Sequence, residues 1–121
     1  MQRQHRLRAD ADFRRVRRCG RSWGHSLLVL YAARPGAGAP PEDGAPTRVG
    51  VTVGRGVGGA VVRNRVRRRI REAVRVRYDC VTPGWDLVFV ARGASAEAGG
   101  DELARAVETL LARAGLLTGE T

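Results

Sequence analysis

The sequence contains no lysine: all 22 of its basic residues are arginine. Cysteine is also scarce, because Cys19 and Cys80 stand alone without a CxxC pair or a zinc-type spacing. Such isolated thiols argue against a disulfide or metal framework and indicate a reducing compartment. The longest apolar run, at residues 27–33, is far too short to cross a bilayer, and the N-terminus has no apolar signal core. We therefore expect a cytoplasmic protein without membrane association.

The sequence also offers few of the residue combinations with which a protein would itself catalyse RNA cleavage. Small basic ribonucleases use a pair of histidines as acid and base. Here His5 falls in a segment, residues 1–8, that we expect to be extended or frayed, and His25 begins a strand. The sequence shows no Ser-His-Asp or Cys-His set and no carboxylate cluster suited to a two-metal site. These gaps argue against a nuclease whose catalytic groups belong to the protein.

The net charge of +10 is concentrated in two blocks. Residues 1–21 carry +6 and residues 55–77 carry +8, whereas residues 22–54 are neutral and residues 78–121 carry −4. Folding of this single domain could bring both blocks onto one surface. Arginine binds phosphate bidentately and stacks on bases, which suits RNA. Codon bias in a GC-rich genome also explains arginine in place of lysine, so the position of the charges is the functional signal.

The stretch at residues 58–77 predicts a helix with two contrasting sides. At 100° per residue, an apolar stripe faces the core, and a basic side faces away from it. A merely solvated face would interleave glutamate with arginine, but only Glu72 offsets the charge here. The helix therefore indicates a polyanionic partner. The stripe is Val62, Val66, Ile70, Ala73 and Val74; the opposite side is Asn64, Arg68, Arg71 and Arg75; Arg63, Arg67, Arg65 and Arg69 flank the stripe.

The remaining patterns predict an α+β sandwich of helices on a small sheet. A first helix, capped by Asp10 or Asp12, runs to about Arg18 and stops at Gly20. Strands are expected at residues 26–33, 48–53 and 86–92, with one further short strand between 48–53 and the basic helix, and a last helix at 101–114. In the first strand, Leu27, Val29 and Tyr31 should share one face, and Leu28 and Leu30 the other. Residues 35–46 form a connector rich in proline, glycine and alanine, which we expect to be flexible. The whole chain, residues 1–121, is expected to form one RNA-binding domain.

Residues 54–59, GRGVGG, match the dinucleotide-binding pattern G-x-G-x-x-G between a strand and a helix. We reject that site, because only one βα unit surrounds it and the chain cannot supply a doubly wound sheet. A Walker loop is excluded because no Gly-Lys-Ser/Thr follows. The glycines can still let backbone N–H groups at a helix N-terminus approach phosphate.

Two aromatic residues have two readings each. Phe13 lies among four arginines in the first helix, and Tyr31 lies on the first predicted strand. An aromatic ring in a basic segment can stack an unpaired base. It can equally anchor its own element to the core, and the residue types alone leave both readings open.

The stretch at residues 49–75 resembles the signature of the bacterial ribonuclease P protein subunit. An RNR motif on a helix after a strand and a basic glycine loop carries the likeness, which covers roughly residues 5–113. It implies a compact domain of order αβββαβα, a mostly antiparallel sheet and a left-handed βαβ crossover, against the usual handedness. The matching residues are Gly58, Ala60, Val61, Arg63, Asn64, Arg65, Arg68, Arg71 and Glu72, with Leu7, Asp12, Phe13, Val16, Gly20, Val29, Leu30, Tyr31 and residues 86–92 in order.

This resemblance also implies a function. The partner would be a catalytic RNA subunit, one protein per RNA, which with bound Mg²⁺ removes the 5′ leader of precursor tRNA. The basic helix would face that RNA, and a cleft between the first helix and the sheet would hold the leader. The implied RNA-binding residues are Phe13, Arg14, Arg17, Tyr31, Arg55, Arg63, Asn64, Arg65, Arg67, Arg68 and Arg71. The alternative is a ribosomal protein or assembly factor that binds structured RNA without supporting catalysis.

The sequence departs from the family pattern at three positions. Arg17 stands where many members carry a second aromatic, which exchanges stacking for charge. Gly56 replaces a second basic residue beside Arg55. Arg69 replaces an apolar residue, which predicts looser packing of the basic helix.

Overall fold

The structure, a computed structural model, describes residues 5–34 and 46–118. The connector predicted at residues 35–46 lies outside the described residues except for its last one. The order αβββαβα is confirmed. The elements are α1 (Asp10–Cys19), β1 (Arg21–Gly24), β2 (Leu28–Ala33), β3 (Arg48–Thr52), α2 (Ala60–Arg77), β4 (Asp86–Ala91) and α3 (Gly100–Arg113), with 3-10 turns η2 (Arg55–Val57), η3 (Tyr78–Cys80) and η4 (Gly93–Glu97).

The strands of the described residues form one sheet in the order β1-β2-β4-β3. β2 pairs antiparallel with both β1 and β4, and β3 pairs parallel with β4, so the sheet is mostly antiparallel, as expected. The further short strand was predicted in the wrong place: it is β1, which follows α1 directly, whereas the described residues between β3 and α2 form the turn η2. The parallel pair requires a crossover from β3 to β4, and α2 lies in that connection. The left hand of this crossover stays a prediction from the resemblance.

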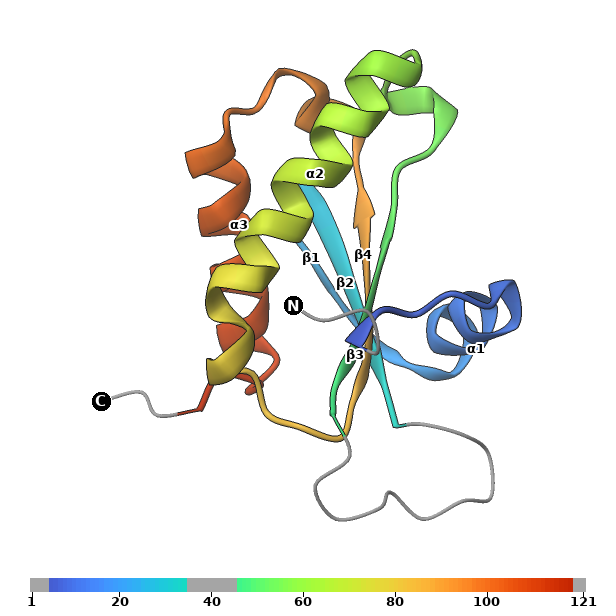
Figure 1. Ribbon diagram of the computed structural model, residues 1–121, viewed down its shortest axis with the longest axis vertical. Helices are drawn as coiled ribbons and strands as arrows, with labels where there is room; N and C mark the ends of the chain where they lie inside the picture. The colour runs from blue at the N-terminus through green and yellow to red at the C-terminus, as the bar shows by residue number, and fades with distance from the viewer. Residues whose placement is uncertain (1–4, 35–45, 119–121) are drawn as a thin grey trace.

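The two faces of the sheet are covered differently (Figure 1). α2 and α3 lie over one face, and α1 lies against the other. Alternation along β2 turns Leu28 and Leu30 toward the α2–α3 side, where both are fully buried, and turns Val29 and Tyr31 toward α1, as predicted. Leu27, predicted on the side of Tyr31, packs against the main core instead, because it precedes β2 and does not follow the alternation. The stripe of α2 is confirmed too: Val66, Ile70, Ala73 and Val74 are buried in this main core, and Val62 packs against it.

A smaller core lies under α1. Val16 of α1 and Val88 of β4 are fully buried there, together with Leu7 and Ala33. The predicted cap of α1 is wrong: the N-cap position is Ala9, whose methyl group cannot accept a hydrogen bond, and Asp12 faces Arg15 of α1 and Arg48 of β3 instead. The predicted stop is confirmed, since the N–H of Gly20 donates to the Val16 carbonyl at 2.9 Å.

Residues 6–9, which precede α1, are extended but not frayed, whereas residues 1–4 of the predicted segment lie outside the described residues. The N–H of Leu7 donates to the Val49 carbonyl at 3.0 Å, and the Leu7 side chain is 5% exposed. Arg6 forms a parallel bridge with Val49, at the edge of the sheet. The ring of His5 lies 4.4 Å from that of Tyr78, centroid to centroid. A short hydrogen-bonded segment therefore covers part of the β3 edge.

Candidate nucleic-acid interface

The outer side of α2 carries a pocket of about 490 Å³, walled mainly by guanidinium groups. The helical period places these side chains there, because they are three and four residues apart and opposite the buried stripe. Asn64 and Arg68 are exposed, and Arg67 donates to the side-chain oxygen of Asn64 at 2.8 Å. We call this surface the arginine face. Its pocket is lined by Arg6, Asn64, Arg67, Arg68, Arg71, Glu72 and Arg75.

Acidic neighbours neutralise little of this charge among the described residues. Glu72 accepts two hydrogen bonds from Arg75, which lower the pKa of the Glu72 carboxyl and raise the pKa of Arg75. Arg77 pairs with Glu108 of α3 at 3.2 Å. The pKa of Arg71 is lowered by burial and by the positive charges of Arg6 and Arg67. That shift marks a site where positive charge accumulates, and an anion would stabilise it.

The flanking arginines of α2 differ in their contacts. Arg65 donates to the Ala96 carbonyl and Arg69 to the Ala98 carbonyl, both at 2.9 Å. These bonds join α2 to the segment around η4, so Arg69 fixes the packing here, contrary to the expectation that it loosens the helix. Arg63 is half-buried, and its Nε and that of Arg65 are buried without a hydrogen-bond partner. RNA binding by Arg63 and Arg65 stays a prediction.

A second pocket, of about 410 Å³, lies between α1, β3 and α2. We call it the α1 cleft. Because Arg67 also lines the arginine face, this residue connects the two pockets, and the two basic blocks of the sequence meet there. The lining comprises Asp10, Phe13, Arg14, Arg17, Val51, Thr52, Val53 and Arg67.

The Phe13 ring fits into the cleft because the neighbouring residue on β3 is Gly50. A Cβ at Gly50 would lie 2.4 Å from two carbons of the Phe13 ring, so the missing side chain makes room for the aromatic. Phe13 is half-buried and packs on the small core under α1, with one side toward the cleft. It therefore anchors α1, which confirms one of the two readings, and it also lines a pocket, while stacking of a base on its ring stays a prediction.

Tyr31 lies beside the α1 cleft rather than in its lining. In the sheet, Val88 pairs with Gly50 on one side and with Tyr31 on the other, so the tyrosine is two strands away from the Phe13 contact. The guanidinium carbon of Arg17 lies 5.5 Å from the Tyr31 ring centroid. Arg17 thus covers the Tyr31 ring by a cation–π contact.

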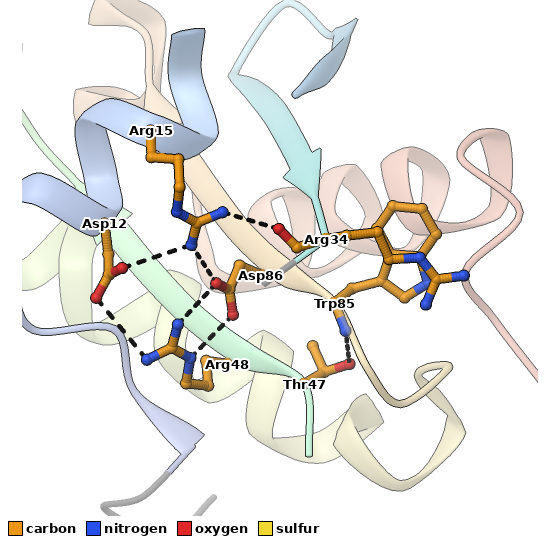
Figure 2. Close-up of polar contacts among 7 residues, drawn as sticks. All are labelled: Asp12, Arg15, Arg34, Thr47, Arg48, Trp85 and Asp86. Carbon is orange, nitrogen blue, oxygen red and sulfur yellow. Dashed lines mark hydrogen bonds and ion pairs between the residues drawn. The ribbon is translucent and has the colours of Figure 1, made fainter. Parts of the chain in front are cut away.

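Unlike its neighbours Arg14 and Arg17, Arg15 binds a buried carboxylate (Figure 2). Asp86, at the start of β4, is completely buried and points to the α1 side of the sheet. Arg48 of β3 binds both of its oxygens, at 2.9 and 2.8 Å, and Arg15 binds one of them at 2.5 Å. Asp12 lies 3.5 Å from Arg15 and 3.8 Å from Arg48. Two arginines are thus used internally to join α1 to the sheet.

One predicted residue, Arg55, lies apart from both pockets, and one residue that was not predicted, Arg6, lines the first of them. Arg55 is exposed in η2, just before α2, and lines neither the arginine face nor the α1 cleft. Arg6, which sequence reasoning placed in a frayed end, lines the arginine face. Its position next to Leu7, a buried apolar residue in a basic segment, was the available signal.

Within residues 5–34 and 46–118, no group of three or more His, Cys, Asp or Glu side chains could hold a metal ion. Over the same ranges, no helix combines the length and the apolar character needed to span a bilayer.

Comparison with known proteins places this arrangement in a family. Residues 1–115 match the family described as Ribonuclease P. The ribonuclease P protein component of Roseiflexus castenholzii is 47% identical over 120 residues, which cover 98% of this chain and 93% of the relative. That of Clostridium novyi is 40% identical over 116 residues, covering 96% and 98%.

Solved structures agree with the sequence comparison. A Staphylococcus aureus RNase P protein mutant with defective mRNA degradation activity superposes with a TM-score of 0.81 at 26% identity, covering 93% of this chain and 90% of that one. The RNase P protein of Thermotoga maritima, solved with 1-(4-fluorophenyl)-2-thiourea, gives 0.76 at 26% identity, covering 89% and 98%. From motif, fold and relatives together, this chain belongs to the ribonuclease P protein family.

Proposed function

We propose that this chain is the protein subunit of ribonuclease P. It binds the catalytic RNA subunit through the arginine face and the 5′ leader of precursor tRNA in the α1 cleft, and it supports removal of the leader. The observation that carries this proposal is that Arg67 lines both pockets, which makes the two surfaces continuous. We expect one protein per RNA, in the cytoplasm, with Cys19 and Cys80 reduced.

The proposed division of labour assigns the chemistry to RNA. Mg²⁺ prefers oxygen ligands, but the side-chain oxygens of Asn64 and Glu72 on the arginine face accept hydrogen bonds from Arg67 and Arg75 among many positive charges, so this face does not fit a magnesium site of its own. We expect the RNA subunit to hold the ion. The protein contributes positive charge, which lets RNA phosphates come close together, and arginines that displace condensed counterions.

Leader binding gives the protein a way to favour the reaction. Precursor tRNA carries a leader and mature tRNA does not, so contacts in the α1 cleft strengthen substrate binding without strengthening product binding. Such differential binding aids substrate capture and product release, although no protein group takes part in breaking the bond.

A reconstitution assay tests the proposal. The protein is mixed with the ribonuclease P RNA of the same genome and leadered precursor tRNA at low Mg²⁺, and 5′ cleavage is measured by gel. We expect faster cleavage than with RNA alone, because the arginines replace part of the charge neutralisation that Mg²⁺ supplies. No gain in rate, with binding to other structured RNAs intact, would favour a ribosomal protein or assembly factor instead.

Arg68→Ala is expected to weaken binding of the RNA subunit about tenfold, because one charged hydrogen-bonding group is lost. Because Arg68 is exposed on the arginine face without an acidic partner in the described residues, the plot of log affinity against log salt should also flatten by about 0.7 to 0.9. Filter binding at several salt concentrations measures both quantities.

Arg75→Ala is the matched control for Arg68→Ala. It removes the same side chain from the same helix, but Arg75 is already paired with Glu72. Its effect on the salt slope should be clearly smaller. An unchanged salt slope for Arg68→Ala would show that the Arg68 side chain does not contact a phosphate.

A further inference from the structure

The pocket on the arginine face includes one residue that α2 does not supply. Arg6 comes from the segment before α1, whereas every other side chain that lines the pocket comes from α2. Arg6 lies outside the RNR motif. The question is whether its presence is incidental or whether it completes a binding site.

The backbone fixes Arg6 at this place. The bridge to Val49 and the Leu7 N–H bond to the Val49 carbonyl hold the segment along the edge of β3. Because successive side chains of an extended chain point to opposite sides, burial of Leu7 under α1 turns Arg6 toward α2. The side chain is exposed at the pocket, but its Cα is anchored, so little backbone entropy remains to be lost on binding.

Electrostatics show that the guanidinium groups act on one another. Burial and, after it, the positive charges of Arg6 and Arg67 lower the pKa of Arg71, and all three side chains line the same pocket. The acid that lines the pocket, Glu72, is engaged by Arg75. Such a cluster is unfavourable in the free protein and becomes favourable when a multivalent anion enters.

We propose that Arg6, Arg67 and Arg71 together bind a backbone phosphate of the catalytic RNA subunit. This inference rests on the proposed function and extends it to a residue outside α2. Guanidinium groups are suited to the task because each can offer two parallel N–H donors to phosphate oxygens. Asn64 and Arg68, exposed at the same pocket, give the adjoining RNA further donors.

The structure favours the RNA subunit over the leader as the source of this phosphate. The leader is proposed to lie in the α1 cleft, and Arg6 and Arg71 are absent from the lining of that cleft. Only Arg67 lines both pockets. Loss of Arg6 should therefore affect assembly of the holoenzyme and leave its preference for leadered substrate unchanged.

The test compares Arg6→Ala with Arg8→Ala. Both remove one exposed arginine from the same segment, but Arg8 lies outside the pocket. Arg6→Ala should raise the Kd for the RNA subunit roughly fivefold to tenfold and flatten the salt slope by about 0.7 to 0.9, whereas Arg8→Ala should do clearly less. Thermal unfolding of both variants checks that the fold is retained, and Arg6→Gln repeats the test with a longer side chain.

A double-mutant cycle locates the contact. If Arg6 and Arg71 share one phosphate, the losses from Arg6→Ala and Arg71→Ala will not add, while losses from Arg6→Ala and Arg113→Ala, on α3, will. Equal effects of Arg6→Ala and Arg8→Ala, or additivity with Arg71→Ala, would overturn the inference. A loss of precursor binding to the preformed holoenzyme, with RNA-subunit affinity unchanged, would overturn the assignment to the RNA subunit.

The outcomes also separate this inference from the proposed function. If the unmodified protein binds and activates the RNA but Arg6→Ala behaves like Arg8→Ala, only the Arg6 site fails. If the unmodified protein neither binds the RNA subunit nor accelerates cleavage, the proposed function itself fails.

Discussion

Asp86→Ala is expected to lower the free energy of unfolding by about 3 kcal/mol, because it removes a buried carboxylate that accepts charge-assisted hydrogen bonds from two partly buried guanidinium groups. Asp86 is completely buried and accepts three hydrogen bonds from Arg15 and Arg48. Without it, the side chains of Arg15 and Arg48, 21% and 35% exposed, keep Asp12 as an acidic neighbour, and Arg15 keeps its bond to the Arg34 carbonyl. The hydrogen bond from Arg48 to Asp86 raises the pKa of Arg48.

Urea denaturation followed by circular dichroism measures this loss. Asp101→Ala is the control, because it removes the same side chain from an exposed site on α3, and should cost about 1 kcal/mol or less. Asp86→Asn keeps the shape but not the charge, and should fall between the two. A loss for Asp86→Ala no larger than that for Asp101→Ala would show that the cluster does not stabilise the fold.

The position of this cluster connects stability with RNA binding. Asp86 joins β4 to α1 through Arg15 and to β3 through Arg48 (Figure 2). α1 and β3 supply most of the residues that line the α1 cleft. The elements on two sides of the cleft are therefore joined through two arginines whose guanidinium groups are engaged inside the protein.

Phe13→Ala is expected to weaken binding of leadered precursor tRNA by roughly fivefold to 150-fold, because stacking of one base on an aromatic ring contributes about 1 to 3 kcal/mol. Binding of mature tRNA should change little, since it has no leader to stack. Equilibrium binding of both tRNAs to the reconstituted holoenzyme measures the ratio. The effect is expected at Phe13 because its ring both lines the α1 cleft and is held in place over Gly50.

Phe13→Leu separates stacking from packing. Leucine keeps much of the apolar contact with the small core but has no aromatic face. It should retain the stability of the fold and still lose most of the preference for leadered precursor. If both tRNAs lose affinity equally in either variant, the cleft is not the site of the leader.

Periodic patterns in the sequence predicted most of the fold. The stripe of α2 and the alternation of β2 were correct because burial of one side dictates a period of 3.6 or 2 residues. β1 could not be placed in advance, since residues 21–24 are short and mostly exposed and gain their strand pairing from β2. Such a strand depends on its neighbour rather than on its own pattern.

The site was less predictable, because charge alone does not show where an arginine points. Arg14, Arg15 and Arg17 look equivalent in the sequence, yet Arg15 binds Asp86 and Arg17 covers Tyr31. Asp86 looked like the polar first residue of a strand, and only the pairing of β4 with β3 places Arg48 beside it. These contacts join residues far apart in the chain, which local patterns do not encode.

The place of β4 in the sheet has a consequence for biosynthesis. β4 lies between β2 and β3, although it is the last strand in the chain among the described residues. When β4 pairs with β2 and β3, long loops of the chain are closed. Loop closure costs conformational entropy before the strand pairing compensates for it, and this slows folding. On the ribosome, α2 is therefore complete before the strand that finishes its packing surface has been made. Until residues 86–91 emerge, the nascent chain exposes a strongly cationic amphipathic segment, and folding of the sheet must wait for them.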